Sequence, residues 1–283
     1  MGTGRYHLQV QVTFSDWKSA PFAVEGESIF AVGDVHGCAA HLAAVLKAVS
    51  EIATPAGQRR RLLYLGDMVD RGPDNIGVLR LWAETEKARS VDRIDRIIGN
   101  HEIIMLLCLE GGALADKAGT MWLSEAMGGA QVLDEMRRAC HAPDAKPSYA
   151  LAREALGEQV IRHLLAQRSH VRVGNALFVH GGIDGEADQQ AFLAPSWKEF
   201  TDARWAWITR GFLDWKQGFG GTLVVHGHTP PDKHFPLTGM ADPHLFQEDR
   251  LGLDGGSART GTVTAAQIED GRYRIFKATD AAN

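Results

Sequence analysis

The chain has 283 residues, of which 45% are hydrophobic and 23% charged, and its formal net charge is −5. This composition is typical of a globular protein with one substantial core, so we predict a single domain over residues 1–283. The acidic charge disfavours a nucleic-acid-binding or membrane-surface protein, because both present a basic face.

Further features of the sequence indicate where in the cell the protein is located. No apolar stretch reaches the ~18 residues of a membrane-spanning helix, and the first residues lack the layout of a signal peptide. The cysteines at 38, 108 and 140 are far apart and form no CxxC pair. They are typical of reduced thiols and indicate a cytoplasmic protein. The only basic run, 59–61, is interpreted as a solvated loop end.

The first half of the chain alternates predicted strands with predicted helices. Apolar runs predict strands over 7–14, 28–32, 62–65 and 93–98, and apolar residues spaced three and four apart predict helices over 41–52, 74–88 and 103–109. A polar motif follows each of the last three strands. In α/β folds the loops after parallel strands gather at one edge of the sheet, so these motifs should meet.

The second half begins with helical patterns over 120–127, 131–138 and 149–167 that contain no motif. We interpret residues 111–169 as a helical cap or insertion that walls the site. Strands are predicted over 171–179, 222–225, 252–254, 262–268 and 272–276, and a helix over 199–215. The strands ending near 179 and 225 also lead into polar motifs.

Six potential metal ligands follow these strand ends: Asp34, His36, Asp67, Asn100, His180 and His228. Each alone could be a turn residue or a satisfied core histidine. Their recurrence after five strands favours a site. Carboxylate, amide and imidazole ligands together are typical of two transition-metal ions rather than calcium, magnesium or structural zinc. Two such ions, ~3.5–4 Å apart, can share a carboxylate and a hydroxide that attacks phosphorus.

The motifs GDVHG (33–37), GDMVDRG (66–72), GNHE (99–102), HGG (180–182) and GHT (227–229) occur in this order. The series resembles the binuclear metallophosphoesterases with a calcineurin-like fold, particularly the phosphoprotein phosphatase branch with its bacterial and lambda-phage serine/threonine phosphatases. The resemblance implies an α/β fold in which a β-sandwich is flanked by helices (αββα).

The resemblance also implies a division of the ligands between the two metals. It assigns Asp34, His36 and His228 to one ion and Asn100 and His180 to the other, with Asp67 bridging them. The implied cofactors are two divalent transition-metal ions, with manganese as the first choice and iron or zinc as alternatives.

Family roles map onto four further residues. His101 would be the general acid that protonates the leaving oxygen, and Asp70 would hold its tautomer. Arg71 would grip two phosphate oxygens with its planar guanidinium, assisted by Asn100. Arg210 resembles the second phosphate-binding arginine of the family.

Two residues near the motifs have open roles. His226, two positions before His228, is interpreted as support for the ligands rather than as a ligand. Asp254 either lies near the site or is a turn residue. The tryptophans at 197, 205, 207 and 215 are assigned to the core rather than to substrate stacking.

We therefore predict a dinuclear-metal-dependent phosphomonoesterase acting on phosphorylated Ser, Thr or Tyr of proteins or on small phosphate monoesters. The alternative is a bis(5'-nucleosyl)-tetraphosphate hydrolase of the same fold, a group that commonly lacks an Asp at the position of Asp70. A scaffold without activity would not need His101, and a nuclease is disfavoured by the acidic charge. The oligomeric state is left open.

Overall fold

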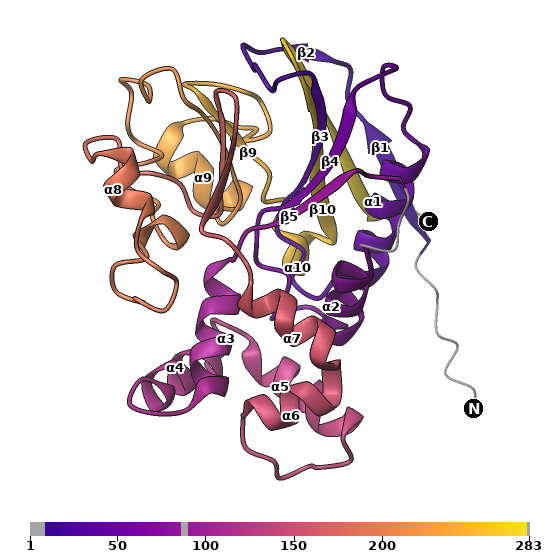
Figure 1. Ribbon diagram of the computed structural model, residues 1–283, viewed down its shortest axis with the longest axis vertical. Coiled ribbons are helices and arrows are strands. Elements are labelled where there is room, and N and C mark those ends of the chain that lie inside the picture. Colours follow the sequence, from indigo (N-terminus) through magenta and orange to yellow (C-terminus); the bar gives the residue numbers. More distant parts are fainter. Residues whose placement is uncertain (1–8, 86–89, 282–283) are drawn as a thin grey trace.

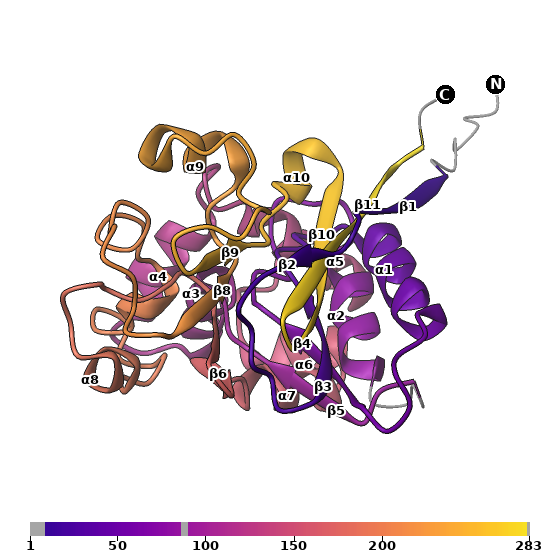
Figure 2. The same ribbon diagram turned by 90° about the horizontal axis from the view of Figure 1, so that it is seen from above.

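The computed structural model describes residues 9–85 and 90–281, so residues 7, 8 and 86–88 of the predicted elements lie outside it. It contains two β-sheets with helices around them (Figures 1 and 2). The larger sheet consists of β1 (Val10–Phe14), β2 (Lys18–Ser19), β3 (Glu27–Val32), β4 (Arg59–Tyr64), β5 (Arg93–Arg96), β10 (Thr262–Glu269) and β11 (Arg272–Asp280). The smaller sheet consists of β6 (His170–Val173), β7 (Ala176–Val179), β8 (Leu223–His226) and β9 (Arg250–Gly252).

The strand order places the motif-bearing strands side by side. The larger sheet runs β1-β11-β10-β3-β4-β5, and β3, β4 and β5 are parallel neighbours. In the smaller sheet β7, β8 and β9 are parallel neighbours. The carboxyl ends of β3, β4 and β5 therefore meet at one edge, as the sequence predicts.

The alternation of side chains along the strands creates two cores. On β3, Ile29 and Ala31 cluster with Phe178 and Val225 of the smaller sheet, so they fill the space between the sheets. The intervening Phe30 belongs instead to the core beneath the helices. The predicted β-sandwich flanked by helices is confirmed.

The helices cover the outer face and one end of the sandwich. They are α1 (Ala39–Glu51), α2 (Asn75–Glu84), α3 (Asn100–Glu110), α4 (Ala115–Trp122), α5 (Gly129–Ala139), α6 (Tyr149–Leu156), α7 (Glu158–Leu165), α8 (Gln189–Leu193), α9 (Pro231–Thr238) and α10 (Ser257–Thr260). Helices α4 to α7 make up the predicted helical region, and they pack against α2 and α3 at the bottom of Figure 1. Gly157, with a φ of 87°, separates α6 from α7, where one helix was predicted.

The helix predicted over 199–215 is wrong. Only a 3₁₀ turn over Arg204–Ala206 forms, and the surrounding chain is irregular. The carbonyl of Trp205 accepts the N–H groups of Gly181 and Gly182, so the backbone serves the HGG loop rather than a helix. Among the described residues, no helix is long and apolar enough to cross a membrane.

The basic run 59–61 is not a solvated loop end, because it begins β4. Arg61 is buried and donates to the carboxylates of Glu27 on β3 and Asp95 on β5. Arg59 also contacts Glu27, at 3.1 Å, but its side chain is 70% exposed. One buried guanidinium thus neutralises carboxylates on both neighbouring strands.

We predict that Arg61→Met lowers the free energy of unfolding by about 3–5 kcal/mol, because it removes the buried cation between two buried carboxylates and leaves them with exposed partners such as Arg59 and Arg93. Arg59→Met, which removes an exposed contact to the same Glu27, should change it by about 1 kcal/mol or less. Urea denaturation of both variants measures the difference. Equal losses would contradict this account of β4.

Candidate metal centre

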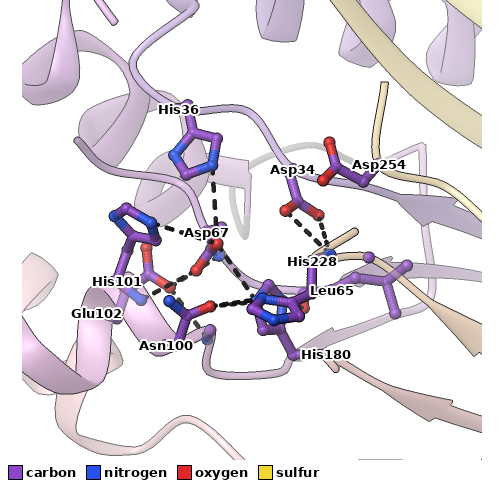
Figure 3. A network of polar contacts seen from close by, with 12 residues as sticks. Asp34, His36, Leu65, Asp67, Asn100, His101, Glu102, His180, His228 and Asp254 are labelled. Atoms are coloured by element: carbon purple, nitrogen blue, oxygen red, sulfur yellow. Dashed lines mark hydrogen bonds and ion pairs between the residues drawn. The ribbon is translucent and has the colours of Figure 1, made fainter. Parts of the chain in front are cut away.

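The predicted ligands converge at the edges of both sheets (Figure 3). They come from the turns after β3, β4, β7 and β8 and from the first turn of α3. They surround a cavity of about 520 Å³. The cavity wall includes four predicted ligands (His36, Asp67, Asn100 and His228) and the predicted acid, His101. Asp34 and His180 are fully buried behind that wall.

Asp67 is the centre of the cluster. Its Oδ2 lies 3.3 Å from His180 Nε2, 3.7 Å from His36 Nε2 and 3.9 Å from His101 Nε2. Its donor atoms group with His180 and His228 on one side and with His36 and His101 on the other. This carboxylate is therefore placed to be shared by two cations.

The ring of His228 lies beside Asn100 and His180. Asn100 Oδ1 is 2.9 Å from His228 Nδ1 and 3.0 Å from His180 Nε2. Only the backbone N–H of His228 reaches Asp34, which accepts it at 3.1 Å. The ring of His228 therefore lies on the same side of Asp67 as Asn100 and His180, and its assignment with Asp34 and His36 to one metal stays a prediction.

The donor chemistry fits divalent cations. His180 Nδ1 donates to the Leu65 carbonyl at 2.8 Å, so a neutral ring presents the lone pair of Nε2 to Asn100 Oδ1 and Asp67 Oδ2. Three acceptors facing one another repel unless a cation lies between them. Although burial lowers it, the Asp67 carboxylate raises the pKa of His180 to about 10, so at neutral pH a proton occupies Nε2 unless a metal ion takes its place between these atoms.

Buried carboxyl groups near these ligands increase the need for positive charge at the site. Burial, together with the charge of Asp254, raises the pKa of Asp34 well above its ordinary value. Burial also raises the pKa of Asp254 to about 6. Asp254 lines the cavity and points toward Asp34 in Figure 3, and its Oδ1 accepts the N–H of Gly256, so it lies near the site and also stabilises a turn. Such a group of carboxylates is stable when cations compensate it.

Sequence analysis missed Glu102, which is fully buried beneath the ligands. Its Oε2 accepts the N–H groups of Asp67 and Gly99, and its Oε1 accepts those of Met68 and Val69. One carboxylate therefore ties the loop after β4 to the start of α3. Its position three residues after the N-cap Gly99 is that of a capping-box glutamate, which was the available signal.

The backbone of the site is conformationally unusual. Five site residues that are not glycine have left-handed φ angles of 43° to 73°: His36, Asp67, Asp70, Arg71 and His228. Each such conformation costs of the order of 1–3 kcal/mol and persists only where its surroundings enforce it. Its concentration here marks these turns as a functional site.

His101, in the cavity wall, makes a short contact with Asp70, which is buried behind it. Asp70 Oδ2 lies 2.6 Å from His101 Nδ1, and Trp122 Nε1 donates to Asp70 Oδ1 at 2.9 Å. Burial lowers the pKa of His101 to about 4 and raises that of Asp70 well above its ordinary value. Burial thus favours the neutral forms of both groups, and the short contact with Asp70 fixes the orientation of the His101 ring.

The predicted phosphate-binding arginines differ in position. Arg71 lines the cavity, where it lies 3.1 Å from His36 Nε2 and donates to the Ala126 carbonyl at 3.4 Å. Arg210 is exposed and is not among the described residues of the cavity wall, although the preceding Thr209 is. A phosphate contact by Arg210 therefore stays a prediction.

Other residues of the cavity were not predicted. Lys233 of α9 and Arg259 of α10 line it, and Arg259 is paired with Asp232 at 2.8 Å. Neither lies in a motif, so no local signal identified them. His226 is buried against Phe212 and stacks with His234 rather than facing the ligands.

Comparison with known proteins defines the class. The sequence model of the calcineurin-like phosphoesterase family matches residues 28–251. The chain therefore belongs to the calcineurin-like phosphoesterase family and is a metal-dependent hydrolase of the phosphatase class.

Named relatives share moderate identity with the chain. It is 33% identical over 112 residues to a symmetrical bis(5'-nucleosyl)-tetraphosphatase of Nitrosospira multiformis, a match covering 39% of this chain and 38% of that protein. A protein of the same name from Ralstonia nicotianae is 26% identical, over 84% of this chain and 88% of its own length. The structure of a cold-active protein-tyrosine phosphatase from a psychrophilic Shewanella species has a TM-score of 0.50 at 18% identity, covering 88% of this chain and 80% of that one. This last likeness shows the fold alone.

We expect purified protein to contain two divalent metal ions per chain, and a strong chelator should abolish turnover and lower the melting temperature. The reason is that the buried acids and facing acceptors then lose their compensating charge. Metal analysis and thermal denaturation with and without added manganese measure both effects. In His228→Ala, one ion should be lost and the other retained. Full activity in verified metal-free protein would exclude a metal centre.

Proposed function

We propose that this protein is a dinuclear-metal-dependent phosphomonoesterase that hydrolyses phosphorylated Ser, Thr or Tyr side chains of proteins or small phosphate monoesters. The observation that carries the proposal is the 2.6 Å contact between Asp70 and His101 at the wall of the metal cavity. The family resemblance implies that bis(5'-nucleosyl)-tetraphosphate hydrolases commonly lack this carboxylate.

The proposed metal ligands are Asp34, His36, Asp67, Asn100, His180 and His228. Bound there, two divalent ions supply a water that ionises near neutral pH and positive charge for the phosphoryl oxygens. Imidazole and oxygen donors without thiolate suit manganese, iron or zinc, and manganese is our first choice. A cytoplasmic location belongs to the same proposal and is supported by three cysteines that form no disulfide.

His101 and Arg71 have complementary roles. When the bond between phosphorus and the leaving oxygen breaks, that oxygen needs a proton, which His101 donates while Asp70 stabilises the ring. Arg71 is exposed in the cavity and can donate two N–H groups to a terminal phosphate. We assign a second phosphate contact to Asn100 and, from the family resemblance, to Arg210.

A second candidate is hydrolysis of bis(5'-nucleosyl) tetraphosphates, which is supported by the names of the curated relatives. In these dinucleotides every phosphate is internal. A terminal phosphate monoester instead carries two negative charges and three unesterified oxygens. The planar guanidinium of an arginine can donate two N–H groups to two of those oxygens. The two candidates therefore differ in what Arg71 recognises.

We predict that His101→Asn retains both metals but lowers kcat by roughly 10²–10⁴-fold on substrates whose leaving group needs a proton. The loss should be much smaller for nitrophenyl phosphate, because nitrophenolate leaves without protonation. Kinetics on phosphoserine peptide and nitrophenyl phosphate, with metal analysis, test this. A variant that loses metal and slows equally on both substrates would assign His101 to the metal rather than to proton transfer.

We expect nitrophenyl phosphate and phosphopeptides to be hydrolysed far faster than diadenosine tetraphosphate or bis-nitrophenyl phosphate. Arg71→Ala should narrow this gap by slowing the monoesters, since a charge-assisted bidentate contact is lost. Arg153→Ala, at an exposed arginine on α6 outside the cavity wall, serves as the control. Comparable kcat/KM for monoester and diadenosine tetraphosphate would instead establish the second candidate.

A further inference from the structure

Trp122 links the helical region to the cavity. It is the last residue of α4, and its side chain is fully buried. Its indole N–H donates to one oxygen of Asp70, whose other oxygen contacts His101. The two carboxylate oxygens are thus divided between a tryptophan of the helical region and a histidine of the site. Trp122 itself is not among the described residues that line the cavity.

Glycines close to Trp122 leave the space in which its indole makes this contact. A Cβ on Gly129 would lie 2.2 Å from Trp122 Nε1, so glycine is required for the indole to fit. The same segment reaches Arg71, because a Cβ on Gly128 would lie 2.8 Å from its backbone nitrogen and Ala126 accepts from its guanidinium. Residues 122–129 therefore fix the neighbouring side chains of Asp70 and Arg71 together.

We propose that Trp122 is a positioning residue that acts on His101 through Asp70. The indole N–H fixes the rotation of the buried carboxylate, so that its second oxygen holds His101 Nδ1 and directs Nε2 into the cavity. Without this donor, the Asp70 oxygen loses its partner in a site that excludes water. The inference rests on the proposed function, in which His101 protonates the leaving group.

Trp122→Phe removes the N–H and keeps an aromatic ring in the pocket. We expect kcat on a phosphoserine peptide to fall roughly tenfold, the effect of losing one buried hydrogen bond. The KM and the kcat on nitrophenyl phosphate should stay within about twofold, because neither depends on leaving-group protonation. Trp215→Phe is the matched control. Its indole donates to the Gly218 carbonyl at 2.7 Å, outside the cavity wall, and its loss should change neither rate.

A double-mutant cycle separates positioning from general stability. If Trp122 acts through Asp70, adding Trp122→Phe to Asp70→Asn should lower kcat by less than about twofold, whereas independent effects would multiply. Gly129→Ala provides a second variant, since it displaces the indole without removing it and should give the same substrate-selective loss. It also carries the test should Trp122→Phe fail to fold.

Measuring His101→Asn together with these variants separates a failure of the positioning role of Trp122 from a failure of the proposed function. If His101→Asn is selective for poor leaving groups but Trp122→Phe and Gly129→Ala are not, the positioning role is excluded and the proposed function stands. A full tenfold loss of kcat on adding Trp122→Phe to Asp70→Asn would also exclude the positioning role of Trp122. If His101→Asn shows no selectivity, the proposed acid itself is wrong.

Discussion

The site depends on one buried carboxylate that contacts neither solvent nor the cavity. Glu102 gathers four backbone N–H groups from the loop after β4 and from the turn that opens α3. Without an acceptor, each of these donors would cost about 1–3 kcal/mol in the dry interior. Because the carboxylate satisfies them together, it enforces the left-handed backbone at Asp67 and sets the relative position of Asp67 and Asn100. The metal ligands are thus fixed through their backbone before any cation contributes.

Charge is the second constraint, and it explains why the ligand set is stable only as a whole. Asp34, Asp67 and Asp254 are buried within one cluster, and the Nδ1 atoms of His36 and His180 contact backbone carbonyls, so that Nε2 of each ring faces the site. Replacing one of these acids reduces the repulsion among the carboxylates but leaves a neighbouring histidine without its partner. Replacing one histidine leaves a carboxylate without its partner, so the repulsion among the carboxylates is less well compensated. Divalent cations satisfy both groups at once, which is why the same residues that would destabilise an ordinary core form a centre here.

Much of this arrangement could be predicted because it is local. A strand followed by Gly and a polar ligand is a short pattern, and parallel pairing brings such turns to one edge. Features that depend on contacts between distant parts of the chain could not be predicted from the sequence. Arg61 looks like a surface cation in sequence, and only the pairing of β4 with β3 and β5 buries it between two carboxylates. The segment 199–215 has helical spacing, but the carbonyl of Trp205 at its centre accepts N–H groups of the HGG loop. The grouping of His228 with Asn100 depends on the ring direction after a left-handed residue, which no spacing rule gives.

The helical region shows how residues outside the sequence motifs can contact the candidate site. The sequence indicates only a wall around the cavity, because residues 111–169 contain no motif. Yet Asp70 cannot satisfy both of its oxygens from the sandwich: one contacts His101, and the other is completed by an indole from α4. Since α4 packs on α3, and α3 begins with Asn100 and His101, any shift of this region relative to α3 changes the geometry of the proposed acid and of the ligand beside it. The segment 122–129 therefore links the helical region to the proposed acid, because a change that moves the Trp122 indole also alters the carboxylate that contacts His101.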